Sequence, residues 1–124
     1  MMNFQQLKDY CLNKRGTYED FPFDGETLVF KVGSKMFALT NINDQKLKVN
    51  LKCDPLMAED FRREYEAIKP GYHMNKVHWN TVEIDGTIDD ETIKMLIDIS
   101  YDLVFNGLNR KEKEEILNLT KKEY

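Results

Sequence analysis

Residues 46–53 read KLKVNLKC, and this stretch decides the fold because its polar and apolar side chains alternate strictly. Successive side chains of a β-strand point to opposite faces, so the alternation predicts a strand with one buried and one solvated face. The buried face would carry Leu47, Val49, Leu51 and Cys53. The solvated face would carry Lys46, Lys48, Asn50 and Lys52. We therefore expect an antiparallel sheet with a lysine-rich surface.

Two segments upstream, Thr27–Val32 and Lys35–Ile42, are rich in β-forming residues and are separated only by Gly33-Ser34. A two-residue connection with glycine first suits a tight type II′ hairpin turn. In that register one face of the pair would carry Leu28, Phe30, Val32, Phe37 and Leu39. The opposite face would carry Val29, Lys31, Met36 and Ala38.

Helix signals flank these strands. Asn3 can cap a first helix, and Gly16 is a natural stop for it. Asp54-Pro55 supplies a cap and an N1 proline for a helix to about Ile68. Its inward positions would be Met57, Phe61, Tyr65 and Ile68.

The C-terminal half predicts one further strand, Val77–Ile84, and a short additional strand around Ile68–Met74. Asp89 or Asp90 would cap a long helix through Phe105, and a polar helix over about Arg110–Leu119 would follow. The fold class is therefore α+β: a two-layer α/β sandwich, α-β(3)-α-β(2)-α, with helices on one face of an antiparallel sheet. Residues 1–108 would form the domain, and residues 109–124 a polar helical tail.

The composition fits one folded domain, because 124 residues with 41% hydrophobic and 32% charged side chains can bury an ordinary core. Cys11 and Cys53 lie far apart without metal-ligand spacing, so we expect two reduced, buried thiols. We expect a cytoplasmic protein without a membrane span, since no long apolar run and no signal-peptide pattern occur.

Charge is segregated along the chain although the net charge is −4. Residues 27–53 carry five lysines against Asp44 alone, whereas residues 83–102 carry seven acids against Lys94. The lysines fall on predicted strands and the acids mainly on predicted helices, so positive and negative charge should lie on opposite sides of the domain. The acids at the start of the long helix are explained by capping and the helix dipole, without a metal ion.

Residues 70–82, PGYHMNKVHWNTV, form a second conspicuous segment because they contain no acid. Its two histidines are five residues apart, which is not a ligand spacing of a helix or a strand, and no third ligand or nucleophile accompanies them. We therefore expect no metal, no cofactor and no catalytic residue. Part of the segment is explained structurally, as a loop over packed side chains.

Three functional hypotheses remain open at this point. In the first, lysines contact DNA phosphates while histidine, asparagine and an aromatic side chain contact other DNA groups. The residues would be Lys31, Lys46, Lys48, Lys52, His73, Asn75, Lys76, His78, Trp79 and Asn80. In the second, the domain binds another protein, as a chaperone-like module. In the third, Tyr72 and the histidines bind or transform a small ligand.

Four segments together carry a family resemblance. They are ETLVFKVGSKMFAL (26–39), VNLKCDP (49–55), PGYHMNKVHWNTV (70–82) and ISYDLV (99–104). The chain resembles the MmcQ/YjbR family from about Asn3 to Leu108. The resemblance implies the secretion-chaperone-like two-layer fold and a non-enzymatic, DNA-binding "double-wing" protein. Its wings would be the loops around Gly33-Ser34, Asn41–Lys46 and Gly71–Lys76.

Overall fold

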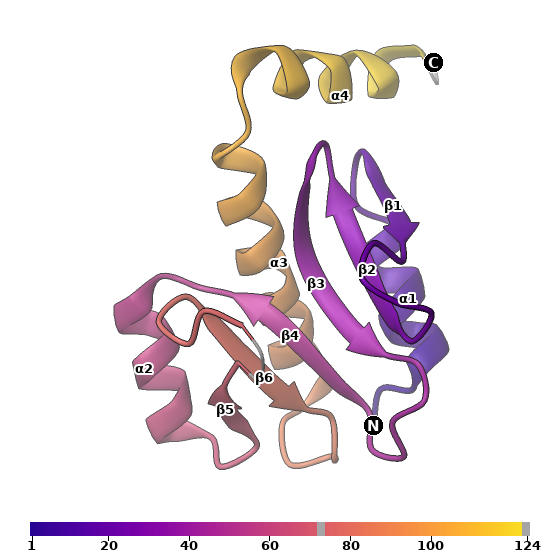
Figure 1. Ribbon diagram of the computed structural model, residues 1–124. Coiled ribbons are helices and arrows are strands. Elements are labelled where there is room, and N and C mark those ends of the chain that lie inside the picture. The colour runs from indigo at the N-terminus through magenta and orange to yellow at the C-terminus, as the bar shows by residue number, and fades with distance from the viewer. Residues whose placement is uncertain (72–73, 123–124) are drawn as a thin grey trace.

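The alternating segment forms β4 (Lys48–Lys52), a strand inside an antiparallel sheet. The computed structural model describes residues 1–71 and 74–122, and within them the sheet has six strands in the order β1-β2-β3-β4-β6-β5 (Figure 1). Every neighbouring pair is antiparallel. The other strands are β1 (Thr17–Asp20), β2 (Thr27–Val32), β3 (Lys35–Asn41), β5 (Ile68–Pro70) and β6 (Trp79–Glu83).

Helices cover one face of this sheet and leave the other uncovered, which we call the open face; the view in Figure 1 looks onto it. The helices are α1 (Phe4–Leu12), α2 (Pro55–Glu64), α3 (Asp90–Asn106) and α4 (Arg110–Lys122). The expected caps are present, because the side chains of Asn3, Asp54 and Asp89 each accept a backbone N–H bond of the following helix. The predicted α+β two-layer fold is confirmed. None of the helices described here has the length and apolarity needed to cross a membrane.

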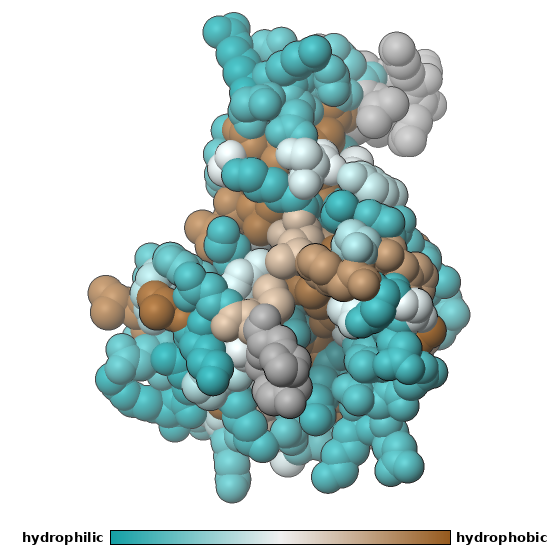
Figure 2. All heavy atoms as spheres, viewed as in Figure 1, coloured by the Kyte–Doolittle hydropathy of each residue, from teal (hydrophilic) through white to brown (hydrophobic). Residues whose placement is uncertain are grey.

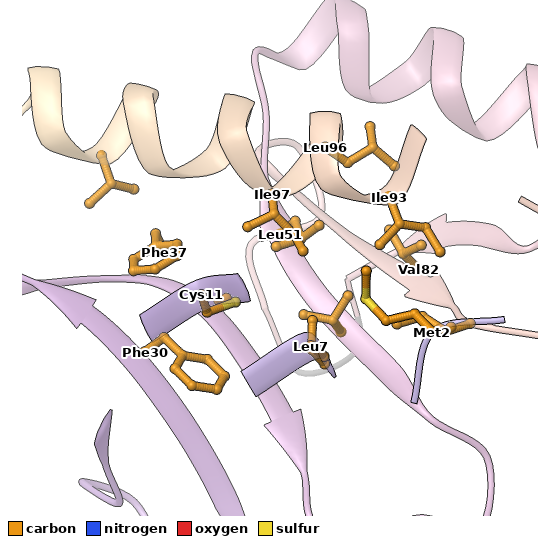
Figure 3. Packing of buried hydrophobic residues seen from close by; sticks show 14 of the residues in the cluster. Met2, Leu7, Cys11, Phe30, Phe37, Leu51, Val82, Ile93, Leu96 and Ile97 are labelled. Carbon is orange, nitrogen blue, oxygen red and sulfur yellow. The ribbon is translucent and has the colours of Figure 1, made fainter. Parts of the chain in front are cut away.

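The core lies between the sheet and the helices (Figure 3). Phe30 and Phe37 from the sheet are fully buried, as are Leu7 of α1 and Ile93 of α3. Each such side chain contributes roughly 1.5–3 kcal/mol relative to an exposed one. Cys11 and Cys53 are buried free thiols, as expected, and burial raises the pKa of Cys11 to about 12.

Strand β1 was not predicted, because TYED contains two adjacent acids and no apolar alternation. It forms as an edge strand paired with β2. Charges from other segments hold it in place: Glu19 lies 3.2 Å from Lys8 of α1, and Asp20 lies 3.0 Å from Lys31 of β2. Its formation depends on partners distant in sequence.

The predicted facing of β3 is wrong at two positions. Ala38 pairs with Phe30 and lies in the core, whereas Leu39 pairs with Val29 and packs on the open face. The register shifts between Phe30 and Lys31, which leaves Phe37 as an extra residue of β3. A bulge of this kind inverts the facing of every residue beyond it.

Two predicted boundaries also move. Helix α2 ends at Glu64, not Ile68; Ile68 instead begins β5, the short strand that the sequence suggested. Met57 is 41% exposed, and Ala58 is the buried side chain of α2. The following strand begins at Trp79 because residues 76–78 form a turn.

One buried hydroxyl joins α3 to two strands. Ser100 Oγ accepts a 2.8 Å hydrogen bond from Lys52 N and donates a 2.5 Å bond to Phe37 O. Strands β3 and β4 pair at only two positions and then separate (Figure 1). The hydroxyl therefore satisfies backbone groups that would otherwise be buried without a partner.

Helix α4 packs on the end of the sheet rather than projecting freely. Ile116 is 5% exposed and contacts Gly16, and Leu108 lies against Gly33 in the β2–β3 turn. Glu112 Oε1 accepts a 2.8 Å hydrogen bond from Ser34 N. The tail beyond residue 108 is thus tied to two turns of the domain.

Replacing Ser100 with alanine should lower the free energy of unfolding by about 2–4 kcal/mol, because two buried backbone groups lose their partner. The matched control is Ser34→Ala, an exposed position at the β2–β3 turn, which should change stability by less than about 0.5 kcal/mol. Urea unfolding followed by circular dichroism measures both. Equal stability of the two variants would contradict the role given to Ser100.

Replacing Gly16 with alanine should destabilise the protein by roughly 1–2 kcal/mol. Gly16 has a φ of 73°, and an added Cβ would meet Ile116 Cγ2 at 2.7 Å. Gly25→Ala is the control, since nothing lies within 4 Å of a Cβ there. Thermal melting compares them, and a larger loss for Gly25→Ala would contradict this packing of α4.

Candidate nucleic-acid interface

Three of the predicted lysines share the open face. Lys48 and Lys52 alternate along β4 with buried Val49 and Leu51, and Lys31 occupies the equivalent face of β2. All three side chains are half-buried at their bases, as expected for lysine stems lying on a sheet. The arrangement places their ammonium groups on the surface that no helix covers.

Two lysines of this face are neutralised by acids of neighbouring strands. Lys31 Nζ lies 3.0 Å from Asp20, and Lys69 Nζ lies 2.9 Å from Glu83. The hydrogen bond from Lys31 lowers the pKa of Asp20, and the one to Glu83 raises the pKa of Lys69. The expectation that positive charge alone occupies this side is therefore wrong, because β1 and β6 bring acids to it.

The remaining lysines of the predicted interface are unpaired. Within the described residues, Lys46, Lys48, Lys52 and Lys76 form no ion pair. Lys46 and Lys76 are exposed in connections at either end of the face. An unpaired ammonium can neutralise a phosphate without first breaking an internal pair.

Asn80 and Trp79 are not displayed on the surface, contrary to the prediction. Asn80 is 4% exposed on the helix-covered face, where its amide accepts from Arg62 Nη1 at 2.8 Å and donates to Ala58 O. Trp79 lies on the open face but is 7% exposed beneath its neighbours, with Met74 packed against its cluster. Asn80 therefore fastens α2 to β6, and Trp79 supports the loop.

The loop before β6 is built around Asn75. Its Oδ1 accepts from Val77 N at 3.0 Å, and its carbonyl accepts from His78 N and Trp79 N. Asn75 and Lys76 are exposed, and His78 is half-buried. His73 and Tyr72 lie outside the described residues.

The predicted wings differ in their surroundings. The Gly33-Ser34 turn is held by Glu112 of α4, so it is not free to project. Residues 42–46 are exposed along their whole length. The wing at Gly71–Lys76 is only partly described, because residues 72–73 lie outside the described residues.

A groove that the sequence did not indicate lies on the open face, beside Lys48. Its volume is about 480 Å³. It is formed by side chains distant in sequence, among them Phe23, Leu39, Asp44, Lys48, Asn50 and Met74. The sequence offers one local sign of the groove: two phenylalanines in the turn-like segment FPFDG (21–25). In the structure one of them, Phe23, is 63% exposed.

Sequence comparison places the chain among known proteins. A family model described as YjbR matches residues 12–103. The YjbR protein of Escherichia coli (strain K12) is 31% identical over 118 residues, which cover 95% of this chain and 100% of that protein. YyaQ of Bacillus subtilis (strain 168) is 29% identical over 117 residues, 83% of this chain and 98% of YyaQ. The YjbR alignment must include part of α4, because it leaves only 5% of the chain outside.

Solved structures agree with these matches. Protein DR2400 of Deinococcus radiodurans, described as a DUF419 domain, has a TM-score of 0.87 at 42% identity, covering 94% of this chain and 88% of DR2400. A Pseudomonas syringae protein has a TM-score of 0.72 at 32% identity, covering 82% of this chain and 98% of its own. The family model spans most of the chain, and Escherichia coli YjbR is 31% identical over 95% of it, so the chain belongs to the YjbR family.

Proposed function

We propose that this chain binds DNA through the open face of its sheet, as a binding module rather than an enzyme. The observation that carries the proposal is the set of four unpaired lysines, Lys46, Lys48, Lys52 and Lys76. Two of them stand on one face of β4, and the others extend the same basic surface at its ends. The net charge of −4 for the whole chain opposes approach to DNA and makes the interaction weak, whereas its salt sensitivity comes from the lysine–phosphate contacts.

The proposal assigns different roles to paired and unpaired lysines. Lys31 lies on the same face but is already bonded to Asp20 at 3.0 Å, so a phosphate would have to compete with that carboxylate. Lys48 forms no ion pair within the described residues, because Glu83, which lies opposite it in β6, is paired with Lys69. Both positions are lysines on the same face, but in the described part of the chain only the ammonium group of Lys48 is free of an ion pair and can contact a phosphate directly.

Neutralising four phosphates should give a slope of roughly −3 to −4 when log K is plotted against log salt. The probe is a fluorescein-labelled duplex with a single-stranded tail, titrated by fluorescence anisotropy. Lys48→Gln should weaken binding and reduce the magnitude of the slope by about 1. Lys31→Gln, the matched control, should change the slope by less than about half as much.

Two results would contradict the proposal. One is an absence of binding below about 100 μM at low salt, which is weaker than ordinary non-specific binding. The other is an equal effect of Lys31→Gln and Lys48→Gln, since the proposal depends on the difference in pairing. Thermal melting of both variants shows whether the fold is retained.

A further inference from the structure

The groove beside Lys48 has the size and lining of a site for a planar group. Its volume of about 480 Å³ falls in the range of small-molecule sites, roughly 300–1,000 Å³. Its apolar lining includes Met74, which is half-buried, and Leu39, which is 3% exposed and lies at its base. Figure 2 shows hydrophobic side chains gathered near the middle of the open face, with hydrophilic side chains around them.

Phe23 provides an aromatic surface in a fixed loop. Its side chain lines the groove and is 63% exposed, and it makes no ring–ring contact within the described part of the chain. The loop is held by Asp24, whose Oδ1 accepts from Glu26 N at 2.9 Å and from Thr27 N at 2.7 Å. A solvated ring held in this way can stack on a base without a large loss of freedom.

One hydrogen bond orients the side-chain amide of Asn50 in the groove. Asn50 Oδ1 accepts a 2.5 Å bond from Thr81 Oγ1, which leaves the Asn50 NH₂ group as a donor toward the groove. Among the described residues this NH₂ group has no acceptor. Lys48, which lines the same groove, supplies an unpaired ammonium.

We infer that this groove holds one unstacked base of a single DNA strand. The base stacks on Phe23 above Leu39, and the Asn50 amide donates to a base carbonyl or ring nitrogen. Lys48 contacts the neighbouring phosphate. This inference rests on the proposed function and adds a preference for single-stranded DNA. A base paired inside a duplex cannot enter a groove unless it is extruded.

The groove is also lined by two acids, Asp24 and Asp44, which differ in their expected effect on DNA binding. Asp24 is occupied by hydrogen bonds of its own loop. Asp44 is exposed at the groove and forms no ion pair within the described residues. Asp44 should therefore repel the phosphate beside Lys48, and its removal should strengthen binding.

The test compares the full chain with a labelled oligothymidylate and with a blunt duplex of the same length, by fluorescence anisotropy at low salt. The single strand should bind more tightly than the duplex. Phe23→Ala should weaken single-strand binding by about fivefold to a hundredfold, the range for loss of one base–aromatic stack. Asp44→Asn should strengthen it by roughly twofold or more.

Phe21→Ala is the matched control, because Phe21 is 43% exposed in the same loop and does not line the groove. It should change single-strand affinity by less than about twofold. Both phenylalanines are exposed, so melting temperatures close to that of the parent chain confirm that neither variant alters the fold.

The outcomes distinguish the inference from the proposed function. Duplex binding at least as tight as single-strand binding, or equal effects of Phe23→Ala and Phe21→Ala, overturns the inference and leaves the proposed function standing. Failure to bind either form of DNA overturns both.

Discussion

The buried hydroxyl of Ser100 is the interaction on which the rest of the structure depends. It stands where β3 and β4 separate, and it bonds the carbonyl of Phe37 on one strand and the N–H of Lys52 on the other. A helix side chain thus takes the place of part of a strand ladder. This lets the sheet fan out over α3 without leaving backbone groups unsatisfied in the core.

The separation of the two strands shapes the open face. Leu39 turns toward that face because of the extra residue in β3, and there it meets Asn50 of β4 across the last shared pair. The irregularity in β3 therefore supplies the hydrophobic floor of the groove, and the regular alternation of β4 supplies Asn50 beside it. A regular hairpin would have placed Leu39 in the core and Ala38 on the surface.

The sequence predicted well what depends on local pattern. The alternation of polar and apolar residues in β4 reflects its solvated and buried faces, and this prediction was confirmed. The helix caps at Asn3, Asp54 and Asp89 depend only on nearby residues, and they were confirmed as well. The predictions were wrong or incomplete where contacts between segments distant in sequence determine the structure. A bulge in β3, and charges from α1 and β2 that hold β1, have no local signature.

The candidate site shows the same division. The lysines of β4 were predicted because they alternate with apolar residues in one strand. The burial of Asn80 was missed because its partner, Arg62, lies eighteen positions away on α2. The groove was missed because its lining comes from three loops and four strands that are separate in sequence.

The two ends of the sheet limit how the protein can meet other chains. The outermost strands are β1, four residues with two acids, and β5, three residues ending in proline. Proline lacks an N–H donor, and short charged edges do not template a further strand. The short edges therefore disfavour self-association by edge-to-edge pairing and β-strand addition by a peptide, and they leave the open face as the larger exposed surface of the sheet.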